Sequence, residues 1–380
     1  MAHFQKPIRV GIDIRDLRIA KTGQKTVTEE LCKQFAASND GEFVFIFIDS
    51  AMPVYTGKVK WKLIIEHLRY HFWKQFVLPL KAWYKKCDIV FCVDYFVPYL
   101  HLNFKTVEVF HDAFFFEYPE HYNKLWLQLF HKMAMPAARR CSVIMTTTSY
   151  AKGRIAELTG IDRNKLAVIP LAPKTISEKK TLTSIPTHLQ SIIHKKYVLH
   201  VGVMEKRKNL PALIKAFALL LKRTEDDLYL VLVGQGNGKL FSDDAVQVQQ
   251  AIEDSGLGHR VICTGYLPDA EVDMVYQHAS LYVFPSVNEG FGIPVLEAFK
   301  ANIPVLVANN TSLPEVGGDA VLTFDPYDVE DICSKMQLVL STPGVAEMLV
   351  TKGKERLLNF SWEKAATALK NEFRNIVQQR

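Results

Sequence analysis

The feature that most constrains the fold of this chain is a repeated alternation of short apolar runs with helical segments. The runs are rich in Val, Ile, Leu and Phe, and turns containing Gly, Pro or polar residues separate them from segments with helical spacing. We predict strands at 8–14, 43–48, 88–93, 106–110, 143–147, 197–202, 228–233, 261–264, 281–284 and 303–307. Buried strands that alternate with helices predict doubly wound α/β domains with parallel sheets.

The length of 380 residues suits two such domains. Between Pro170 and His194 the sequence has three prolines, several Lys, Ser and Thr residues and little periodicity, which is typical of a connection between domains. We expect a first domain over 1–172, a linker over 173–195, a second domain over 196–360 and a last helix over 361–380.

The composition excludes several classes of protein. The net charge of +6 is mild and does not indicate nucleic-acid binding. The six cysteines show no C-x-x-C spacing and lie mostly in apolar runs, which predicts buried thiols in a reducing compartment. The N-terminus lacks the apolar core of a signal peptide, and no apolar run reaches the about 18 residues of a membrane span. We expect a cytoplasmic protein. No Asp-x-Asp occurs, so we expect no metal cofactor.

The stretch from Pro285 to Ala298 is the strongest functional motif. It follows the apolar run 281–284, and its glycines at 290 and 292 allow a sharp turn and a close approach to a ligand. Pro294 suits the first turn of a helix, so free N–H groups would face the carboxyl end of the strand and favour an anion. Glu289 and Glu297 flank this site. One carboxylate can face the reacting end of a ligand, while the other accepts hydrogen bonds from hydroxyls.

Other candidate groups also follow predicted strands. Arg207 and Lys208 stand just before a helix that begins near Asn209 and Pro211, where an anion gains from both side chains and amides. His111 and Asp112 follow the strand at 106–110. The glycine-rich loop at 234–238 suggests a dinucleotide fingerprint, but its G-x-G-x-G spacing favours a flexible loop near a nucleotide.

Together these motifs, above all EGFGIPVLEA and KRKN, resemble those of retaining glycosyltransferases of family 4, which adopt the GT-B fold. The resemblance covers nearly the whole chain and is most specific from 197 to 328. It implies two Rossmann-like domains with a cleft between them and a C-terminal helix that crosses back to the first. It also implies transfer of a hexose, mannose or similar, from a GDP- or UDP-linked donor. The acceptor would be a hydroxyl of a glycan or lipid-linked glycan in surface polysaccharide or lipopolysaccharide synthesis.

The resemblance assigns a role to each candidate residue. Glu289 would hold the donor sugar, Arg207 and Lys208 would stabilise the diphosphate, and His111 would contact the sugar from the first domain. Glu297 would bind the ribose, with further donor contacts from Gly23, Gly234, Gly265, Tyr266, Gly290, Phe291, Gly292 and Ile293. Asp112 and Ser149 would lie on the acceptor side, Ser149 mainly as a helix cap. The sequence departs from the family at 22–26, where only Gly23 remains of a glycine-rich loop, and at Val203, where some members have arginine. We expect a helix to begin near Thr26, because Val27, Leu31 and Phe35 follow at helical spacing.

The segment 58–86 is basic and aromatic, with eight Lys or Arg residues and Glu66 as its one acid. Its interleaved aromatic residues include Trp61, Phe72, Trp73, Phe76, Trp83 and Tyr84. Two interpretations are open. It is either an amphipathic surface for peripheral contact with an anionic membrane or a lipid-linked acceptor, or a crossover helix with buried aromatics and solvated lysines.

Three alternatives to the transferase hypothesis remain. One is a GT-B relative with another reaction, a sugar-nucleotide epimerase or a phosphorylase, and another is a silent protein that only binds nucleotide sugars. The third is a Rossmann dehydrogenase based on the loop at 234–238, which nicotinamide binding would test.

Overall fold

The computed structural model describes residues 6–18, 23–39, 41–57, 59–175, 185–236, 238 and 242–378. Thr22 of the atypical first loop, Lys58, Asn237 and positions 176–184 of the expected linker lie outside the described residues. The chain divides into two compact units, one formed by residues 1–171 with 361–380 and the other by residues 172–360. No helix in the described ranges has the length and apolar character needed to cross a membrane.

The first unit is built on a six-stranded parallel sheet with the order β2-β1-β3-β4-β5-β6. Its strands are β1 Ile8–Asp13, β2 Phe43–Ile48, β3 Ile89–Cys92, β4 Lys105–Val109, β5 Val143–Thr146 and β6 Leu166–Val168. Its helices are α1 Gly23–Ala36, α2 Lys60–Phe72, α3 Leu78–Tyr84, α4 Phe114–Glu117, α5 Lys124–Leu129, α6 Met135–Arg140, α7 Ser149–Thr159 and α16 Trp362–Gln378.

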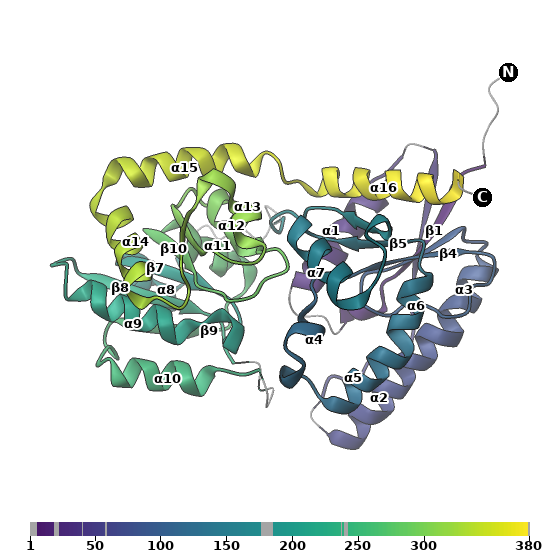
Figure 1. Ribbon diagram of the computed structural model, residues 1–380, viewed down its shortest axis with the longest axis horizontal. Helices are drawn as coiled ribbons and strands as arrows, with labels where there is room; N and C mark the ends of the chain where they lie inside the picture. Colours follow the sequence, from purple (N-terminus) through teal and green to yellow (C-terminus); the bar gives the residue numbers. More distant parts are fainter. Residues whose placement is uncertain are drawn as a thin grey trace. The chain divides into compact units, whose positions relative to one another are not determined.

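Helices cover both faces of this first sheet. In Figure 1, α16 lies on one side of the sheet, and α2, α3, α5 and α6 lie on the other. Alternate residues of β3 show the consequence, since Phe91 contacts Phe373 of α16, with 5.8 Å between ring centroids, while Val90 joins the core cluster beneath the other helices. The last helix is also held by Arg374, whose Nε donates to Glu42 at 2.6 Å.

The second unit has a six-stranded parallel sheet with the order β12-β11-β10-β7-β8-β9. Its strands are β7 Lys196–Val201, β8 Leu228–Val233, β9 Val261–Gly265, β10 Leu281–Phe284, β11 Val305–Ala308 and β12 Leu322–Phe324. Its helices are α8 Thr187–Ile193, α9 Leu210–Leu221, α10 Ala245–Asp254, α11 Asp269–Gln277, α12 Ile293–Lys300, α13 Leu313–Gly317, α14 Val329–Ser341 and α15 Pro343–Leu357.

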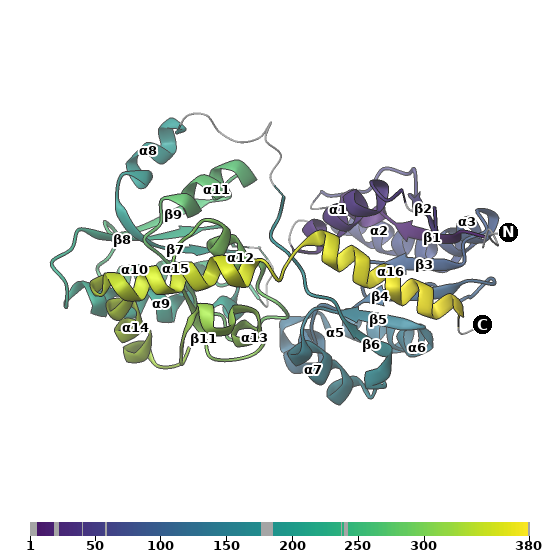
Figure 2. The same cartoon turned by 90° about the horizontal axis from the view of Figure 1, so that it is seen from above.

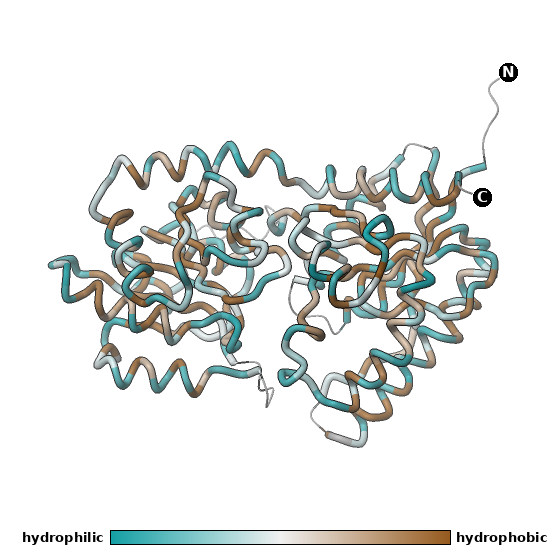
Figure 3. Tube along the Cα trace, viewed as in Figure 1, coloured by the Kyte–Doolittle hydropathy of each residue, from teal (hydrophilic) through white to brown (hydrophobic). Residues whose placement is uncertain are grey.

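The predicted doubly wound parallel sheets are confirmed in both units. Strands β7, β10 and β11 are buried along almost their whole length because helices cover both faces of the sheet (Figure 2). The tube coloured by hydropathy shows the same pattern, with hydrophobic residues concentrated inside each unit and hydrophilic residues on its surface (Figure 3). The strand order of the second sheet is that of a Rossmann fold.

Several local predictions were wrong. Helix α1 begins at Gly23 rather than near Thr26, so the described part of the atypical loop is helical. Strands β6 and β12 were not predicted, since each has only three residues and lies at a sheet edge. The cap of α7 is Thr148, whose Oγ1 accepts from Ala151 N at 3.1 Å, and Ser149 is the first helical residue. Asn209 adopts a left-handed conformation and does not cap α9 with its side chain.

Candidate active site

The candidate site lies at the carboxyl ends of β7 and β10, which are neighbours at the point where the strand order of the second sheet reverses. In open α/β sheets this is where ligands bind. A 3₁₀ turn, Lys206–Lys208, follows β7, and the loop 285–292 follows β10. The two segments are joined at Arg207, whose carbonyl oxygen accepts from Val287 N at 2.8 Å and lies 2.9 Å from Ser286 Oγ.

Three donors converge on one oxygen of Glu289. Its Oε1 accepts from Arg207 at 2.6 Å, from Lys208 Nζ at 2.6 Å and from Ser286 Oγ at 2.7 Å. Glu289 is 8% exposed and Lys208 is 5% exposed, so this ion pair is largely withdrawn from water. The structure thus brings Glu289 to Arg207 and Lys208, which lie 82 and 81 positions before it in the sequence, and adds Ser286 to them.

The charges in this cluster fix its protonation. Burial alone raises the pKa of Glu289, but Arg207 and Lys208 outweigh it and lower the pKa to about 2. Burial, together with the nearby Arg207 charge, lowers the pKa of Lys208 to about 8, while Glu289 opposes the change. At neutral pH Glu289 is therefore ionised and Lys208 is mostly charged. A carboxylate with so low a pKa is a poor general base.

The loop before α12 has a fixed shape. Gly292 precedes the helix with φ of +104°, and a Cβ there would lie 2.8 Å from the side chain of Leu313. The buried Ser312 hydroxyl donates to the carbonyl oxygen of Glu289 at 2.8 Å and lies 3.1 Å from the carbonyl oxygen of Phe291. The residues from Gly290 to Ile293, which are predicted to contact the donor, therefore lie in a segment whose backbone is held by Ser312 and bordered by Leu313. Their contact with a donor stays a prediction.

Glu297 lies on α12, beside a small hollow of about 40 Å³ that is also lined by Lys174, Asp269, Tyr276 and Lys300. Tyr276 donates its hydroxyl to Glu297 Oε2 at 3.3 Å. Removal from water raises the pKa of Glu297 to about 7, and the charge of Asp269 adds to this, against the hydrogen bond from Tyr276. This carboxylate is thus far more basic than that of Glu289, and it changes its charge near neutral pH.

The loops after β8 and β9 carry the remaining predicted donor contacts of this unit. Gly234 has φ of +132°, and a Cβ there would lie 2.0 Å from the carbonyl oxygen of Gly202. This glycine is thus required because the ends of β7 and β8 approach closely. Gly234 N donates to Gly265 O at 2.9 Å, and Tyr266 is 73% exposed. Their contact with a nucleotide stays a prediction.

The first unit holds the other predicted site residues. His111 follows β4, and burial lowers its pKa to about 4, so the ring is neutral at pH 7. Its buried Nε2 has no hydrogen-bond partner among the described residues. Asp112 Oδ1 accepts from Tyr95 and from Phe114 N, each at 3.2 Å, so it also has a structural task. Gly23 lies at the start of α1.

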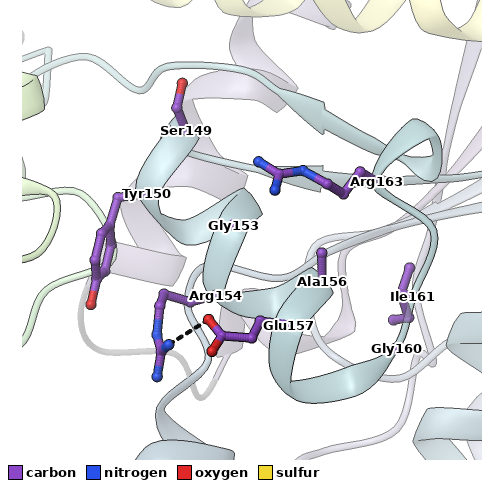
Figure 4. A pocket seen from close by; sticks show the side chains of 9 residues that line it. All are labelled: Ser149, Tyr150, Gly153, Arg154, Ala156, Glu157, Gly160, Ile161 and Arg163. Atoms are coloured by element: carbon purple, nitrogen blue, oxygen red, sulfur yellow. Dashed lines mark hydrogen bonds and ion pairs between the residues drawn. The ribbon is translucent and has the colours of Figure 1, made fainter.

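Ser149 lines an open hollow of about 680 Å³ along α7 (Figure 4). Tyr150, Arg154 and Arg163 are among the other residues that line it, and the guanidinium of Arg154 is paired with Glu157 at 2.6 Å. The hollow gives Ser149 an accessible surface, but its predicted place on the acceptor side stays a prediction.

Comparison with known proteins identifies the family. The model for glycosyltransferase family 4 matches residues 21–172, and the model for glycosyl transferases group 1 matches residues 188–356. The chain belongs to glycosyltransferase family 4. This glycosyltransferase is 29% identical over 283 residues to O-antigen chain mannosyltransferase B of Escherichia coli, an alignment that covers 74% of this chain and 72% of the relative.

One further relative and one solved structure are similar to this chain. It is 30% identical over 236 residues to the serotype-specific mannosyltransferase WbdA of Escherichia coli, but that alignment covers 62% of this chain and only 28% of WbdA. Sucrose-phosphate synthase from Thermosynechococcus elongatus superposes with a TM-score of 0.73 at 18% identity, over 98% of this chain and 100% of that one. The predicted GT-B fold class is thereby confirmed.

Three residues of the glycosyltransferase site were missed by the sequence analysis. Ser286 and Ser312 fix the side chain and backbone of Glu289, and Tyr276 donates to Glu297. Ser286 lies inside the recognised motif, yet a hydroxyl within a loop gives no periodic signal. Tyr276 and Ser312 are distant in sequence from their partners, and only the packing of α11 and α13 around α12 brings them there.

Proposed function

We propose that this enzyme transfers a hexose, mannose or a similar sugar, from a nucleoside diphosphate sugar to a hydroxyl of a glycan or lipid-linked glycan. The anomeric configuration would be retained, and the product would serve surface polysaccharide or lipopolysaccharide synthesis. The names of the mannosyltransferase relatives support the sugar and the pathway class. The observation that carries the proposal is the convergence of Arg207 and Lys208 on Glu289 at the switch point of the second sheet.

The chemistry follows from the charges at this point. Breaking the bond between the sugar and the diphosphate leaves negative charge on a phosphate oxygen. Arg207, Lys208 and the amides at the start of α12 would stabilise that charge. A preorganised cationic site of this kind usually makes a large contribution to the rate enhancement of an enzyme. Because Glu289 is ion-paired with both cations in the free enzyme, it would keep them charged and oriented until the donor enters.

Glu289 would hold the donor sugar rather than attack it. Its pKa of about 2 and its three donors on Oε1 make the carboxylate a weak nucleophile and a weak base. In the mechanism that the family resemblance favours, the acceptor hydroxyl attacks the sugar carbon from the face that the diphosphate leaves. The hydroxyl proton would then pass to the departing phosphate oxygen.

The remaining residues would bind and orient the donor. Glu297 would accept hydrogen bonds from the ribose hydroxyls, and the neutral ring of His111 would contact the sugar. We expect no metal cofactor, because Arg207 and Lys208 would supply the positive charge.

A lipid-linked acceptor is held at a membrane surface. The proposal therefore includes a cytoplasmic enzyme that makes peripheral contact with the membrane through residues 58–86.

A transfer assay tests the proposal. The enzyme is incubated with GDP-mannose, with UDP-hexoses and with a mixture of soluble and lipid-linked glycans, and new glycosidic bonds are identified by mass spectrometry and NMR. Glu289→Ala and Lys208→Ala should each lower turnover at least about a hundredfold, the scale of other charge-stabilising groups. Near-normal turnover in both variants would refute the site. Release of free sugar without acceptor would favour an epimerase, phosphate dependence would favour a phosphorylase, and binding without turnover would favour a silent protein.

A further inference from the structure

The helix formed by α2, the π-helical turn Trp73–Val77 and α3 exposes an apolar outer face. In Figure 1 these elements form one long rod at the edge of the first unit. Eight large apolar side chains on it are between 45% and 66% exposed. This apolar stripe consists of Trp61, Ile64, Ile65, Leu68, Phe72, Phe76, Leu80 and Trp83. A surface helix of a globular protein normally exposes its polar side instead.

The spacing of the apolar residues and the π-helical turn together keep the apolar stripe on one side of the rod. Its members recur three or four residues apart over the whole rod. A purely α-helical run of four-residue steps would drift around the helix, because four residues exceed one turn of 3.6. The wider π-helical turn lies in the middle of the rod and counteracts this drift. The stripe therefore runs continuously from Trp61 to Trp83, along a rod of 25 residues that is about 37 Å long at 1.5 Å per residue.

The inner side of the same helix is anchored by buried charge. Lys74, which is 1% exposed, donates to Asp13 Oδ2 and Asp94 Oδ1, each at 2.7 Å, at the carboxyl ends of β1 and β3. Trp73 Nε1 also donates to Asp13 at 3.2 Å, and Tyr70 donates to Asp94. Since these contacts fix which side of the helix faces the sheet, the stripe cannot turn inward to be buried.

The charge around the stripe has one sign. Glu66 is the one acid between positions 58 and 86, and its buried carboxylate is paired with Arg15. Lys62 is exposed near the first turn of the rod, with its Nζ 5.5 Å from the Trp61 ring centroid, and Lys85 and Lys86 are exposed directly after α3. Lysines therefore flank the apolar stripe at both ends.

We propose that the apolar stripe is a docking surface for an anionic lipid bilayer. Tryptophan and phenylalanine beside lysines are typical of helices that lie in the membrane interface. If a large side chain offers about 150–250 Å² when fully exposed, the half-exposed stripe presents roughly 800 Å², above the about 300–600 Å² of the largest patch on a typical monomer. The positive charge of the flanking lysines selects an anionic lipid surface over a neutral one.

This inference rests on the proposed function only for the reason why an enzyme would dock there, namely to reach a lipid-linked acceptor. It also revises the sequence hypothesis, which counted Lys74 together with the exposed residues of 58–86. Lys74 belongs to the anchor, and the membrane contact is assigned to one face of the helix. Vesicle binding needs no sugar donor, so it can fail while the transferase assignment holds, and the reverse is equally true.

Co-sedimentation with vesicles tests the inference. Vesicles of phosphatidylcholine with about one third phosphatidylglycerol are compared with vesicles of phosphatidylcholine alone. The double variant Leu68→Glu, Phe76→Glu should lower partitioning to the anionic vesicles at least about tenfold, because each carboxylate opposes insertion and is repelled by the lipid charge. Lys85→Gln and Lys86→Gln should each lower it about fivefold. The matched control is Val246→Glu, Met348→Glu, which changes two exposed apolar residues of the second unit and should bind as the wild type does.

Each outcome decides the matter. Circular dichroism and thermal unfolding of every variant establish that the fold is kept, which is expected because all four control and stripe positions are at least 44% exposed. Binding that is lost in the stripe variant and kept in the control supports the inference. Equal binding to neutral and anionic vesicles overturns the anionic partner. No vesicle binding by the wild type overturns the proposed docking surface. A wild-type dimer that only the stripe substitutions dissociate into monomers also overturns it, because the occupant of the stripe would then be a second copy of the chain.

Discussion

The affinity for the sugar donor should follow a bell-shaped curve against pH. Glu297 must be ionised to accept hydrogen bonds from ribose hydroxyls with both oxygens, and its pKa in the free enzyme is about 7. Lys208 must be charged to bind the diphosphate, and its pKa is about 8. A donor that requires both charged forms binds weakly below the first value, because Glu297 is protonated, and weakly above the second, because Lys208 is neutral.

These two pKa values determine the size of the effect. With midpoints at about 7 and 8, the doubly charged form is most abundant at about pH 7.5 and is about sixfold less abundant at pH 6 and at pH 9. The donor affinity should fall by the same factor on each side. A sugar-linked diphosphate has no ionisation of its own in this range, so the curve reports the protein.

Calorimetric titration with the preferred nucleoside diphosphate sugar, without acceptor and at constant ionic strength, measures the curve. Glu297→Gln should weaken binding at pH 7.5 and remove the dependence below that pH, and Lys208→Arg should remove the dependence above it. Tyr276→Phe deletes the hydrogen bond that lowers the pKa of Glu297, so the acidic limb should move to higher pH. A donor affinity that is constant from pH 6 to pH 9 in the wild type would refute the reasoning.

Three further predictions concern stability. Lys74→Met leaves two buried carboxylates without their cation and should lower the free energy of unfolding by about 3–5 kcal/mol in urea denaturation, whereas a loss below about 1 kcal/mol would argue against the anchor. Gly234→Ala should lower the melting temperature and the yield of folded protein, because its Cβ cannot coexist with Gly202 O, and an unchanged melting temperature would contradict this. Burial raises the pKa of Glu108 in the folded state, so the contribution of this group to wild-type stability should fall as pH rises above about 4.5. Glu108→Gln should lessen that fall between pH 5 and pH 8, and parallel curves for the two proteins would contradict it.

The fold was predictable from the sequence because its strands are buried on both faces. Runs such as 228–233 and 281–284 have no polar alternation, and this pattern fits a parallel sheet between two helical layers. The edge strands β6 and β12 were missed because three residues are too few for a period to appear. The start of α1 was placed three residues late because Gly23 is typical of loops and carries no helix signal of its own.

The site residues that lie in short motifs at the ends of strands were predictable. The contacts between residues distant in the sequence were not. Glu289, Arg207 and Lys208 were named from the ends of two strands, and the structure joins them at 2.6 Å. Nothing in the sequence indicated that Arg207, Lys208 and Ser286 all donate to the same oxygen of Glu289. Nor did it indicate that the pKa values of Glu289 and Glu297 differ by about five units. That difference arises because cations surround one carboxylate, whereas the other is removed from water.

The buried cluster at the first sheet was hidden for the same reason. Lys74 has the sequence context of a solvated lysine in a basic segment, and only the π-helical turn and the neighbouring strand ends turn it inward. Its burial leaves Trp61, Phe72, Phe76 and Trp83 exposed, whereas Trp73 is buried beside it, so the helix matches a crossover helix with buried aromatics only in part.

The central claim is that Arg207, Lys208 and Glu289 bind the diphosphate of a sugar donor. It is tested most directly by thermal shift against a panel of nucleoside diphosphates and their sugars, with and without EDTA, for the wild type, Lys208→Ala and the matched exposed variant Lys215→Ala. We predict that a GDP or UDP ligand raises the melting temperature of the wild type and of Lys215→Ala, that the rise survives EDTA, and that Lys208→Ala loses most of it. No rise in the wild type with any ligand, or an equal rise in Lys208→Ala, would contradict the claim.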